Sequence, residues 1–160
     1  MAHPNLSIID RLYRSFQHLD AAGMAACYAD DAAFEDEVFS LCGKREVVGM
    51  WTMLCDNVRA RGLDDWKLGF EAQGADDGHG RAHWVADYRF SATGRMVHNV
   101  IDAEFDFRDG LIVHQRDRFD FWRWSRQAFG PVGLLLGWTP LLRSKVRATA
   151  ASNLRRFLDT

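Results

Sequence analysis

The sequence has few cysteines, almost no net charge and no long uninterrupted apolar run, and each scarcity excludes a class of protein. Its three cysteines are odd in number and lack the spacing of metal ligands, which argues against a secreted disulfide framework and against a metal site. A net charge of −2 without any long basic run excludes the electrostatic footprint of a nucleic-acid-binding protein. We therefore expect no nucleic-acid partner and no metal.

Export and membrane insertion are also disfavoured. Residues 1–13 lack the cationic and apolar segments of a signal sequence. The longest apolar stretch, residues 129–142, is interrupted by Pro131 and Pro140 and is too short to span a bilayer. We expect a cytoplasmic protein with no membrane partner.

Aromatic residues, in contrast, are abundant. The chain has eleven Phe, six Trp and three Tyr among 160 residues, while its 48% hydrophobic and 26% charged residues are ordinary for a globular protein. So many rings in a small chain are expected to fill a core and also to line a pocket. A single domain with a small, mostly apolar pocket follows from this composition.

Helical periodicity dominates the first sixty residues. Apolar residues recur at helical spacing over residues 6–19, and a helix over about 44–61 is predicted between Gly43 and Gly62. A second, shorter helix is predicted after Gly23, carrying Met24, Cys27 and Tyr28.

From Trp66 the period changes to two, which predicts strands over about 66–73, 84–90, 97–107 and 111–121. The remainder predicts a short helix, a Gly/Pro-punctuated apolar crossing and a terminal helix. The fold class is therefore α+β, with helices and an antiparallel meander. We expect one domain over residues 1–160, with a core of about 5–122 and a C-terminal helical extension of about 123–160. The terminal helix is expected to bear an apolar stripe of Leu142, Val146, Ala150, Leu154 and Phe157.

The strand register decides which side chains face the pocket. A three-residue loop at 108–110 would place Ile101 opposite Asp117. A two-residue loop would instead place Asp102 opposite Asp117, and directly opposed like charges are unfavourable. We expect the three-residue loop.

This register separates an apolar face from a charged one. Helices should cover the apolar face, whereas the charged face should be solvated or form an interface. On the charged face Glu104 is expected between His83 and His114, a row that usually hydrogen-bonds rather than binds a metal. The apolar face carries Trp84, Tyr88, Phe90, Val97, Ile101, Phe105, Phe107, Val113 and Phe119, with Asn99, Gln115 and Asp117 as its polar members.

Several motifs carry a family resemblance. CYADDAAFEDEVF, LCGKREVVGMW and AEFDFRDGLIVHQRDRFD, over roughly residues 5–122, resemble the nuclear transport factor 2-like superfamily. That superfamily includes ketosteroid isomerases, SnoaL-like polyketide cyclases and limonene-epoxide-hydrolase-like enzymes. TGRMVHN, FRDGLI and WRWSRQAFG are similar to a bacterial SnoaL-like subgroup. The resemblance implies a strongly curved, cone-shaped sheet around N-terminal helices, a homodimer through the outer sheet face, and no cofactor.

By the same resemblance, Asp36 stands at the place of the isomerases' catalytic base, and Leu12 or Tyr13 near their oxyanion-hole tyrosine. Asp102 matches their second acid in the sequence, but the favoured register turns it outward. The isomerase set is incomplete, so we do not expect 3-oxosteroid isomerisation.

Asp117 fits the resemblance better. It is similar to the inward acidic residue of the last strand in the cyclases and epoxide hydrolases. The hydrolases also carry Arg-x-Asp on the preceding strand, where this chain has Asn99 and Ile101. Burial on an apolar face should raise the pKa of Asp117, and with Asn99 or Tyr88 as donors it could transfer a proton. Alternatively, Asp117 is tied to backbone amides or arginines, and Asp36 lies at a solvated strand entrance.

Two functional hypotheses remain. The first is a cofactor-independent isomerase, cyclase or dehydratase acting on a small apolar carbonyl compound. The second is a non-catalytic ligand-binding or dimerisation module on the same fold. The segment GPVGLLLGWTPLL would be a belt over one end of the core, a lid on the pocket or, as a weaker third, a membrane attachment. The expected catalytic residues are Asp117, Asp36, Asn99 and Tyr88, and the expected substrate contacts are Tyr13, Trp51, Trp84, Gln115 and Phe119.

Overall fold

The computed structural model describes residues 2–160, and three helices fall in the first part of the chain, as the sequence predicted. They are α1 (Pro4–Gln17), α2 (Ala21–Ala25) and α3 (Lys44–Arg61). The second helix begins before Gly23 and ends at Ala25, so its predicted position after Gly23 is wrong. Cys27 and Tyr28 lie outside it, and Tyr28 already belongs to strand β1 (Tyr28–Glu35). Strand pairing competes successfully with the helix there: the amide of Ile112 donates to the carbonyl of Cys27 at 2.8 Å.

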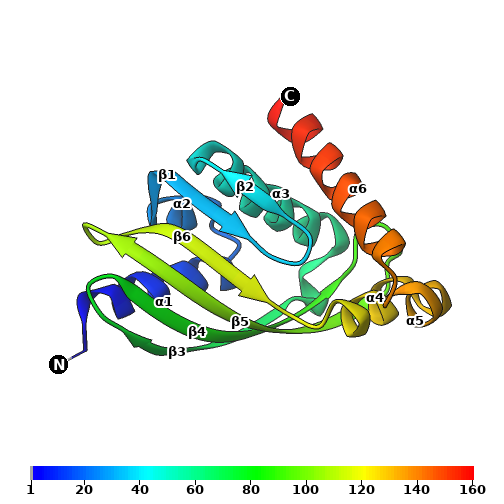
Figure 1. The fold of residues 1–160 in the computed structure, drawn as a ribbon, viewed down its shortest axis with the longest axis horizontal. Helices are drawn as coiled ribbons and strands as arrows, with labels where there is room; N and C mark the ends of the chain where they lie inside the picture. The colour runs from blue at the N-terminus through cyan, green and yellow to red at the C-terminus, as the bar shows by residue number, and fades with distance from the viewer. Residues whose placement is uncertain (1) are drawn as a thin grey trace.

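Six strands form one sheet in the order β2-β1-β6-β5-β4-β3 (Figure 1). After β1 come the short strand β2 (Ser40–Cys42), the 3-10 turn η1 (Leu63–Asp65) and strand β3 (Lys67–Ala75). Neighbouring strands are antiparallel except β1 and β6, which run parallel. The remaining strands are β4 (His79–Arg89), β5 (Met96–Arg108) and β6 (Leu111–Arg118).

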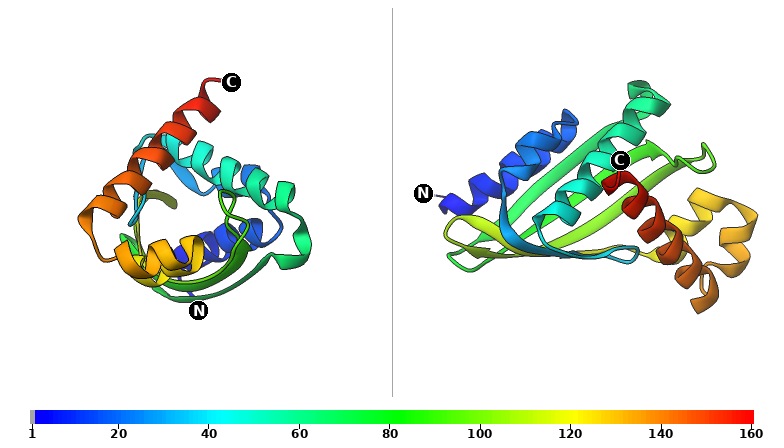
Figure 2. Two further views of the ribbon diagram at one scale, coloured as in Figure 1. Left: turned by 90° about the vertical axis from the view of Figure 1, so that its right-hand side faces the viewer. Right: turned by 90° about the horizontal axis from the view of Figure 1, so that it is seen from above.

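The sheet curves strongly and holds the helices on its concave side, as the resemblance implied (Figure 2). In β5, alternate residues are buried along the whole strand, so one face of the sheet packs and the other meets solvent. Helices α1 and α3 lie across the buried face (Figures 1 and 2). The largest fully buried side chains, which form the centre of this core, include Trp51, Tyr13, Tyr28, Phe34 and Phe105.

The loop between β5 and β6 is a two-residue turn, so the predicted three-residue loop is wrong. Asp109 and Gly110 both have positive φ, 54° and 75°, and Arg108 pairs directly with Leu111. A tight hairpin turn of this kind requires left-handed backbone at both central positions, which glycine and aspartate tolerate better than most residues.

A β-bulge nevertheless keeps the predicted faces. Phe107 pairs with Ile112 and Asp106 with His114, so Val113 is an extra residue in β6. Beyond the bulge Ala103 pairs with Asp117, in place of the predicted Ile101. The inward orientation of Asp117 is therefore confirmed. Near the turn the prediction fails, because Ile112 is fully buried in place of Val113.

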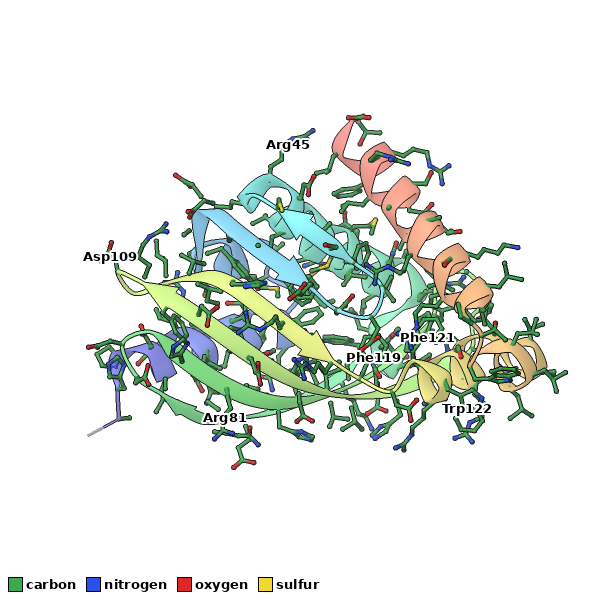
Figure 3. All side chains as sticks on the ribbon, viewed as in Figure 1. Arg45, Arg81, Asp109, Phe119, Phe121 and Trp122 are labelled. Carbon is green, nitrogen blue, oxygen red and sulfur yellow. The ribbon has the colours of Figure 1, made fainter. Side chains whose placement is uncertain are left out.

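The charged outer face pairs differently from the prediction. His83 Nδ1 donates a 2.8 Å hydrogen bond to the carboxylate of Asp102, which lies outside as expected. Glu104 lies opposite Arg81 and within 3.6 Å of Arg116. The predicted row with Glu104 between two histidines is therefore wrong, because the actual register offsets it from His83. Figure 3 shows Arg81 pointing away from the helices on this face.

The C-terminal extension consists of three helices joined by short connections. It contains α4 (Phe121–Phe129), α5 (Pro131–Leu136) and α6 (Pro140–Leu158), so the predicted apolar crossing is itself a short helix. Helix α6 packs on α3: Leu154 is buried, and the Arg45 guanidinium donates to the carbonyl of Leu158 at 3.0 Å (Figure 3). Helices α4 and α5 lie beyond the end of the strands (Figure 2).

Candidate functional site

A cavity of about 550 Å³ lies between the concave sheet, α3 and the C-terminal helices. Its walls are mostly aromatic and aliphatic, which is typical of a site for a small apolar molecule. The polar side chains that reach it are few, and two of them are carboxyls, Asp36 and Asp117. The apolar walls include Phe16, Phe34, Met50, Trp51, Trp84, Ile101, Phe119, Trp124, Leu142 and Val146.

Asp117 enters the cavity from β6. Its side chain is 4% exposed, and its Oδ1 accepts a hydrogen bond of 3.0 Å from Gln115 Nε2. Within residues 2–160 the structure shows a side-chain hydrogen bond to Oδ1 and none to Oδ2, and the residue lines the cavity. Burial raises the pKa of the carboxyl well above its ordinary value. The Gln115 bond opposes this rise, and the charge of Asp36 adds to it.

Gln115 is held by a chain of hydrogen bonds that runs toward Asp117. Trp51 Nε1 donates to the Tyr28 hydroxyl oxygen at 2.9 Å, and that hydroxyl donates to Gln115 Oε1 at 2.5 Å. The amide group of Gln115 is thereby oriented with its Nε2 toward Asp117. Oδ1 is therefore fixed as an acceptor, which leaves Oδ2 as the oxygen that can hold or release a proton.

Asp36 follows β1 and reaches the same cavity from the other side. Its Oδ1 accepts hydrogen bonds from the amides of Val38 at 2.7 Å and Phe39 at 2.6 Å. Burial raises the pKa of Asp36 to about 6, although these two amides partly oppose the shift. From α6, Arg147 donates to the backbone carbonyl of Glu37 at 3.1 Å, which fixes this loop against the extension.

Two neutral donors, Tyr88 and Asn99, also belong to the polar lining. The Tyr88 hydroxyl oxygen accepts a 2.9 Å hydrogen bond from Trp124 Nε1, so its own proton remains available to the cavity. Burial raises the pKa of Tyr88 to about 12, which keeps this donor neutral. Asn99 is 8% exposed, and its side-chain amide has no hydrogen bond within the described chain.

Two buried polar atoms lack any partner within residues 2–160: Trp84 Nε1 and the Tyr13 hydroxyl. Trp84 lines the cavity, although its Nε1 atom is itself buried. Tyr13 lies behind the wall, with its ring centroid 5.6 Å from that of Trp84.

The structure brings most of the predicted residues together. Asp117, Asp36, Asn99 and Tyr88 all line the cavity, as do Trp51, Trp84 and Phe119. Gln115 and Tyr13 lie behind the lining. The donor to Asp117 is Gln115, so the predicted pairing of Asp117 with Asn99 or Tyr88 is wrong.

Sequence reasoning missed Tyr28 and Trp124, which hold Gln115 and Tyr88 in place. For Tyr28, the alternation of buried residues through Ala32 and Phe34 was the available signal, and it was masked by an apparent helical stripe. For Trp124 no local signal existed, because its partner lies 36 residues earlier in the chain.

Metal ligation finds no support in the part of the chain that the structure describes. No group of three His, Cys, Asp or Glu side chains in residues 2–160 could hold a metal ion. The chemistry available to the cavity from this chain includes that of two carboxyls, a phenol, amides, hydroxyls and the cationic side chains of Arg89 and Lys145.

Several solved structures of bacterial proteins share the fold of this chain. An LEH-like epoxide hydrolase of M. tuberculosis is 19% identical, with 87% of this chain and 95% of that chain covered and a TM-score of 0.58. A proposed polyketide cyclase from a Silicibacter species is 21% identical, with 79% and 97% covered and a TM-score of 0.60. A protein from Catenulispora acidiphila with a ketosteroid isomerase-like fold, solved with trimethylamine, is 15% identical, with 83% and 97% covered and a TM-score of 0.59.

At these identities the structures share the fold of this chain and do not define its activity. No functionally curated protein matches the sequence. A family model does match: the SnoaL-like domain aligns with residues 9–115, which run from within α1 through the sheet as far as Gln115. With well over half of its length matched, the chain belongs to the SnoaL-like domain family.

Proposed function

We propose that this protein is a cofactor-independent acid–base catalyst for a small apolar carbonyl compound, of the isomerase, cyclase or dehydratase kind. One observation carries the proposal: two carboxyls with raised pKa values, Asp36 and Asp117, open into one apolar cavity. Pairs of titratable groups whose surroundings separate their pKa values are typical of acid–base sites.

The two carboxyls would take different roles. Asp36, with a pKa of about 6, is mostly ionised at neutral pH and would act as the base that removes a proton from the carbon beside the carbonyl. Asp117, whose pKa is raised further by the charge of Asp36, would stay protonated and donate from Oδ2 to the carbonyl oxygen as negative charge develops there. The proton held by Asp36 then returns to another carbon, or protonates a leaving hydroxyl that departs as water. Asp117 recovers its proton from the enol as the carbonyl re-forms.

The remaining polar groups would position the substrate. The Asn99 amide lines the cavity and has no hydrogen bond within the described chain, so it can bind a substrate oxygen without losing an existing bond. Trp51 and Phe119 supply apolar walls. Every proton in this scheme is held by a side chain of the chain itself, so the reaction requires no cofactor.

The test is a turnover screen on small enolisable ketones, lactones and hydroxy-ketones, comparing the wild type with Asp117→Asn. The amide keeps the size of the side chain and can still accept from Gln115, but it cannot supply an acidic proton. We expect the rate to fall by about a hundredfold or more, the usual contribution of general acid–base catalysis. Asp102→Asn is the matched control, since Asp102 is an exposed aspartate of the neighbouring strand. Equal rates for the wild type and Asp117→Asn would exclude Asp117 as the acid.

The pH profile tests Asp36 separately. A base must be ionised to act, so kcat/KM should rise with pH through about 6 and level off above it. At higher pH it should fall again when Asp117 loses its proton. In Asp36→Asn the rise near pH 6 should disappear together with most of the rate. A rise near pH 6 that persists in Asp36→Asn would assign the base to another group.

The second candidate is a non-catalytic ligand-binding module, and the loop of Asp36 favours it. The Oδ1 of Asp36 closes a turn with two amides, a role that needs no catalysis. If this candidate holds, apolar ligands will raise the melting temperature of the wild type, and no compound in the screen will turn over.

We also propose that the protein is a homodimer through the outer sheet face and acts in the reducing cytoplasm. That face presents alternating charges, such as Arg81 and Glu104 on adjacent strands, which can complement a two-fold-related copy. Cys27, Cys42 and Cys55 are free thiols, which suits a reducing compartment. Sedimentation of Arg81→Glu should reveal a weakened dimer, whereas a monomeric wild type would contradict the dimer.

A further inference from the structure

Six large apolar side chains of the C-terminal extension lie on the surface, and all but one of them lie outside the cavity lining. They project from α5 and from the segment between α5 and the first turn of α6, at the end of the molecule beyond the strands (Figure 2). Elsewhere in the described chain, large apolar side chains with comparable exposure occur singly. We name this cluster the apolar tip: Val132, Leu134, Leu135, Leu136, Trp138 and Leu141, 46–79% exposed.

The packing of α5 forces these side chains outward. Gly133 and Gly137 face α4 so closely that a Cβ on Gly133 would meet the carbonyl of Ser125, and one on Gly137 its hydroxyl oxygen. Trp122 Nε1 adds a 3.1 Å hydrogen bond to the carbonyl of Leu134. Because glycines occupy the inner side of α5, its leucines occupy the outer side. Their exposure is therefore built into the local fold.

The charge of the extension differs sharply from that of the rest of the chain. The whole chain has 20 Lys and Arg against 22 Asp and Glu, but residues 121–158 contain seven basic residues and no acidic one. The remaining residues are therefore strongly acidic. Arg123, Arg126 and Lys145 are exposed and form no ion pair within residues 2–160. The seven are Arg123, Arg126, Arg143, Lys145, Arg147, Arg155 and Arg156.

We propose that the apolar tip docks the protein onto the surface of an anionic phospholipid bilayer. Leucines at the interface of headgroups and acyl chains, tryptophan at headgroup depth and basic side chains against phosphates are the combination that holds peripheral proteins on membranes. No helix within residues 2–160 has the length and apolar character to cross a bilayer. The tip would therefore lie in the interface, where the length of the apolar stretch sets no limit.

Charge also decides against a second copy of the chain as the occupant of the tip. In a two-fold contact each tip would face the other, which would bring two extensions of net positive charge together. An anionic lipid surface has the complementary charge.

The docked orientation would place the cavity against the bilayer. Val132 belongs to the apolar tip and also lines the cavity, and Leu142 and Lys145 continue the lining from α6. An apolar compound dissolved in the bilayer could then enter the cavity without crossing water. This last step rests on the proposed function; the docking itself does not.

The test is co-sedimentation with vesicles in the absence of any substrate. We expect the wild type to pellet with vesicles that contain phosphatidylglycerol, and to bind vesicles of phosphatidylcholine alone at least about tenfold more weakly. Leu135→Asp should weaken binding by about tenfold or more, because it removes inserted apolar area and adds a repelled charge. Leu63→Asp is the matched control: Leu63 is 59% exposed on η1, Leu135 is 68% exposed, and binding of the control should be unchanged.

Arg126→Glu should reduce binding to anionic vesicles and leave weak binding to neutral vesicles unaltered. Circular dichroism shows whether each variant is folded. The proposal is overturned if the wild type stays in the supernatant, or if Leu135→Asp pellets as well as the wild type. It is also overturned if Leu135→Asp instead abolishes a self-association seen without lipid, which would make a second copy the occupant. A catalytic failure of Asp117→Asn affects none of these outcomes.

Discussion

Tyr13 and Tyr28 are both buried phenols of the core, but only Tyr28 has hydrogen-bond partners. Tyr28 joins Trp51 to Gln115, whereas the hydroxyl of Tyr13 has no partner within residues 2–160. Removing one partner of a buried hydrogen bond leaves the other group unpaired, and the protein is destabilised by the desolvation cost of that group. Removing a hydroxyl that has no partner leaves no other group unpaired.

Tyr28→Phe should lower the free energy of unfolding by about 2 kcal/mol or more, since it leaves both the Trp51 N–H and the Gln115 carbonyl unpaired. Tyr13→Phe, the matched control, should change it by less than about 0.5 kcal/mol. Urea denaturation followed by tryptophan fluorescence measures both. A similar loss in the two variants would show that Tyr13 has a partner, such as an enclosed water.

Single residues of the site were predictable where strand alternation determines them. Asp117, Asn99 and Trp84 face the cavity because every second residue of a strand does. The bond from Tyr28 to Gln115 was not predictable, since it joins residues 87 positions apart that meet only when β1 pairs with β6. Nor does any sequence pattern reveal that Asp36 closes a turn with two amides while reaching the cavity.

Among the secondary-structure elements, the strands show how a wrong turn can still give the right face. A two-residue turn with left-handed Asp109 and Gly110 is present in place of the predicted three-residue loop. The bulge at Val113 then restores the predicted orientation of Asp117. A turn and a bulge each change the register by one residue, so only their sum affects the residues beyond both. Charge repulsion and apolar pairing act on the residues beyond both features, so they predict the face of Asp117 without determining the turn.

Helix α5 depends on a close backbone approach that only glycine permits. Gly133→Ala should destabilise the protein by about 1–3 kcal/mol, because the added methyl group has to displace the carbonyl of Ser125. Gly69→Ala, in β3, should have an effect below about 0.5 kcal/mol, as no atom lies within 4 Å of its added Cβ. Guanidinium titration of both variants is the measurement, and equal midpoints would show that α4 and α5 separate without loss.

In the molecule as a whole, the extension and the sheet share one cavity, so we expect them to unfold together. Leu154→Ala should remove about 2–5 kcal/mol, because Leu154 is 3% exposed between α6 and α3. Leu141→Ala, at a 79% exposed leucine of the same helix, should change stability by less than about 0.5 kcal/mol. Calorimetry should show a single transition for Leu154→Ala. Two separate transitions would show that the extension folds independently.

The overall architecture was the most predictable feature. Three helices, an antiparallel meander and a helical extension follow from a change of period at Trp66, and the curvature follows from the family resemblance. The exposure of the apolar tip was not predictable in the same way. An apolar sequence predicts burial, and only the contact of Gly133 with α4 shows that the neighbouring leucines must remain outside.

The walls of the cavity come from the sheet with its loops and N-terminal helices, and from the C-terminal extension, and the two parts carry different side chains. The carboxyls stand on β6 and on the loop after β1, whereas Leu142, Val146 and Ala150 close the space from α6. Substitutions at these three positions of α6 can therefore change the volume of the cavity without moving Asp36 or Asp117. Related proteins could therefore differ in the ligand that they accept through substitutions in this one terminal helix, while both carboxyls keep their positions.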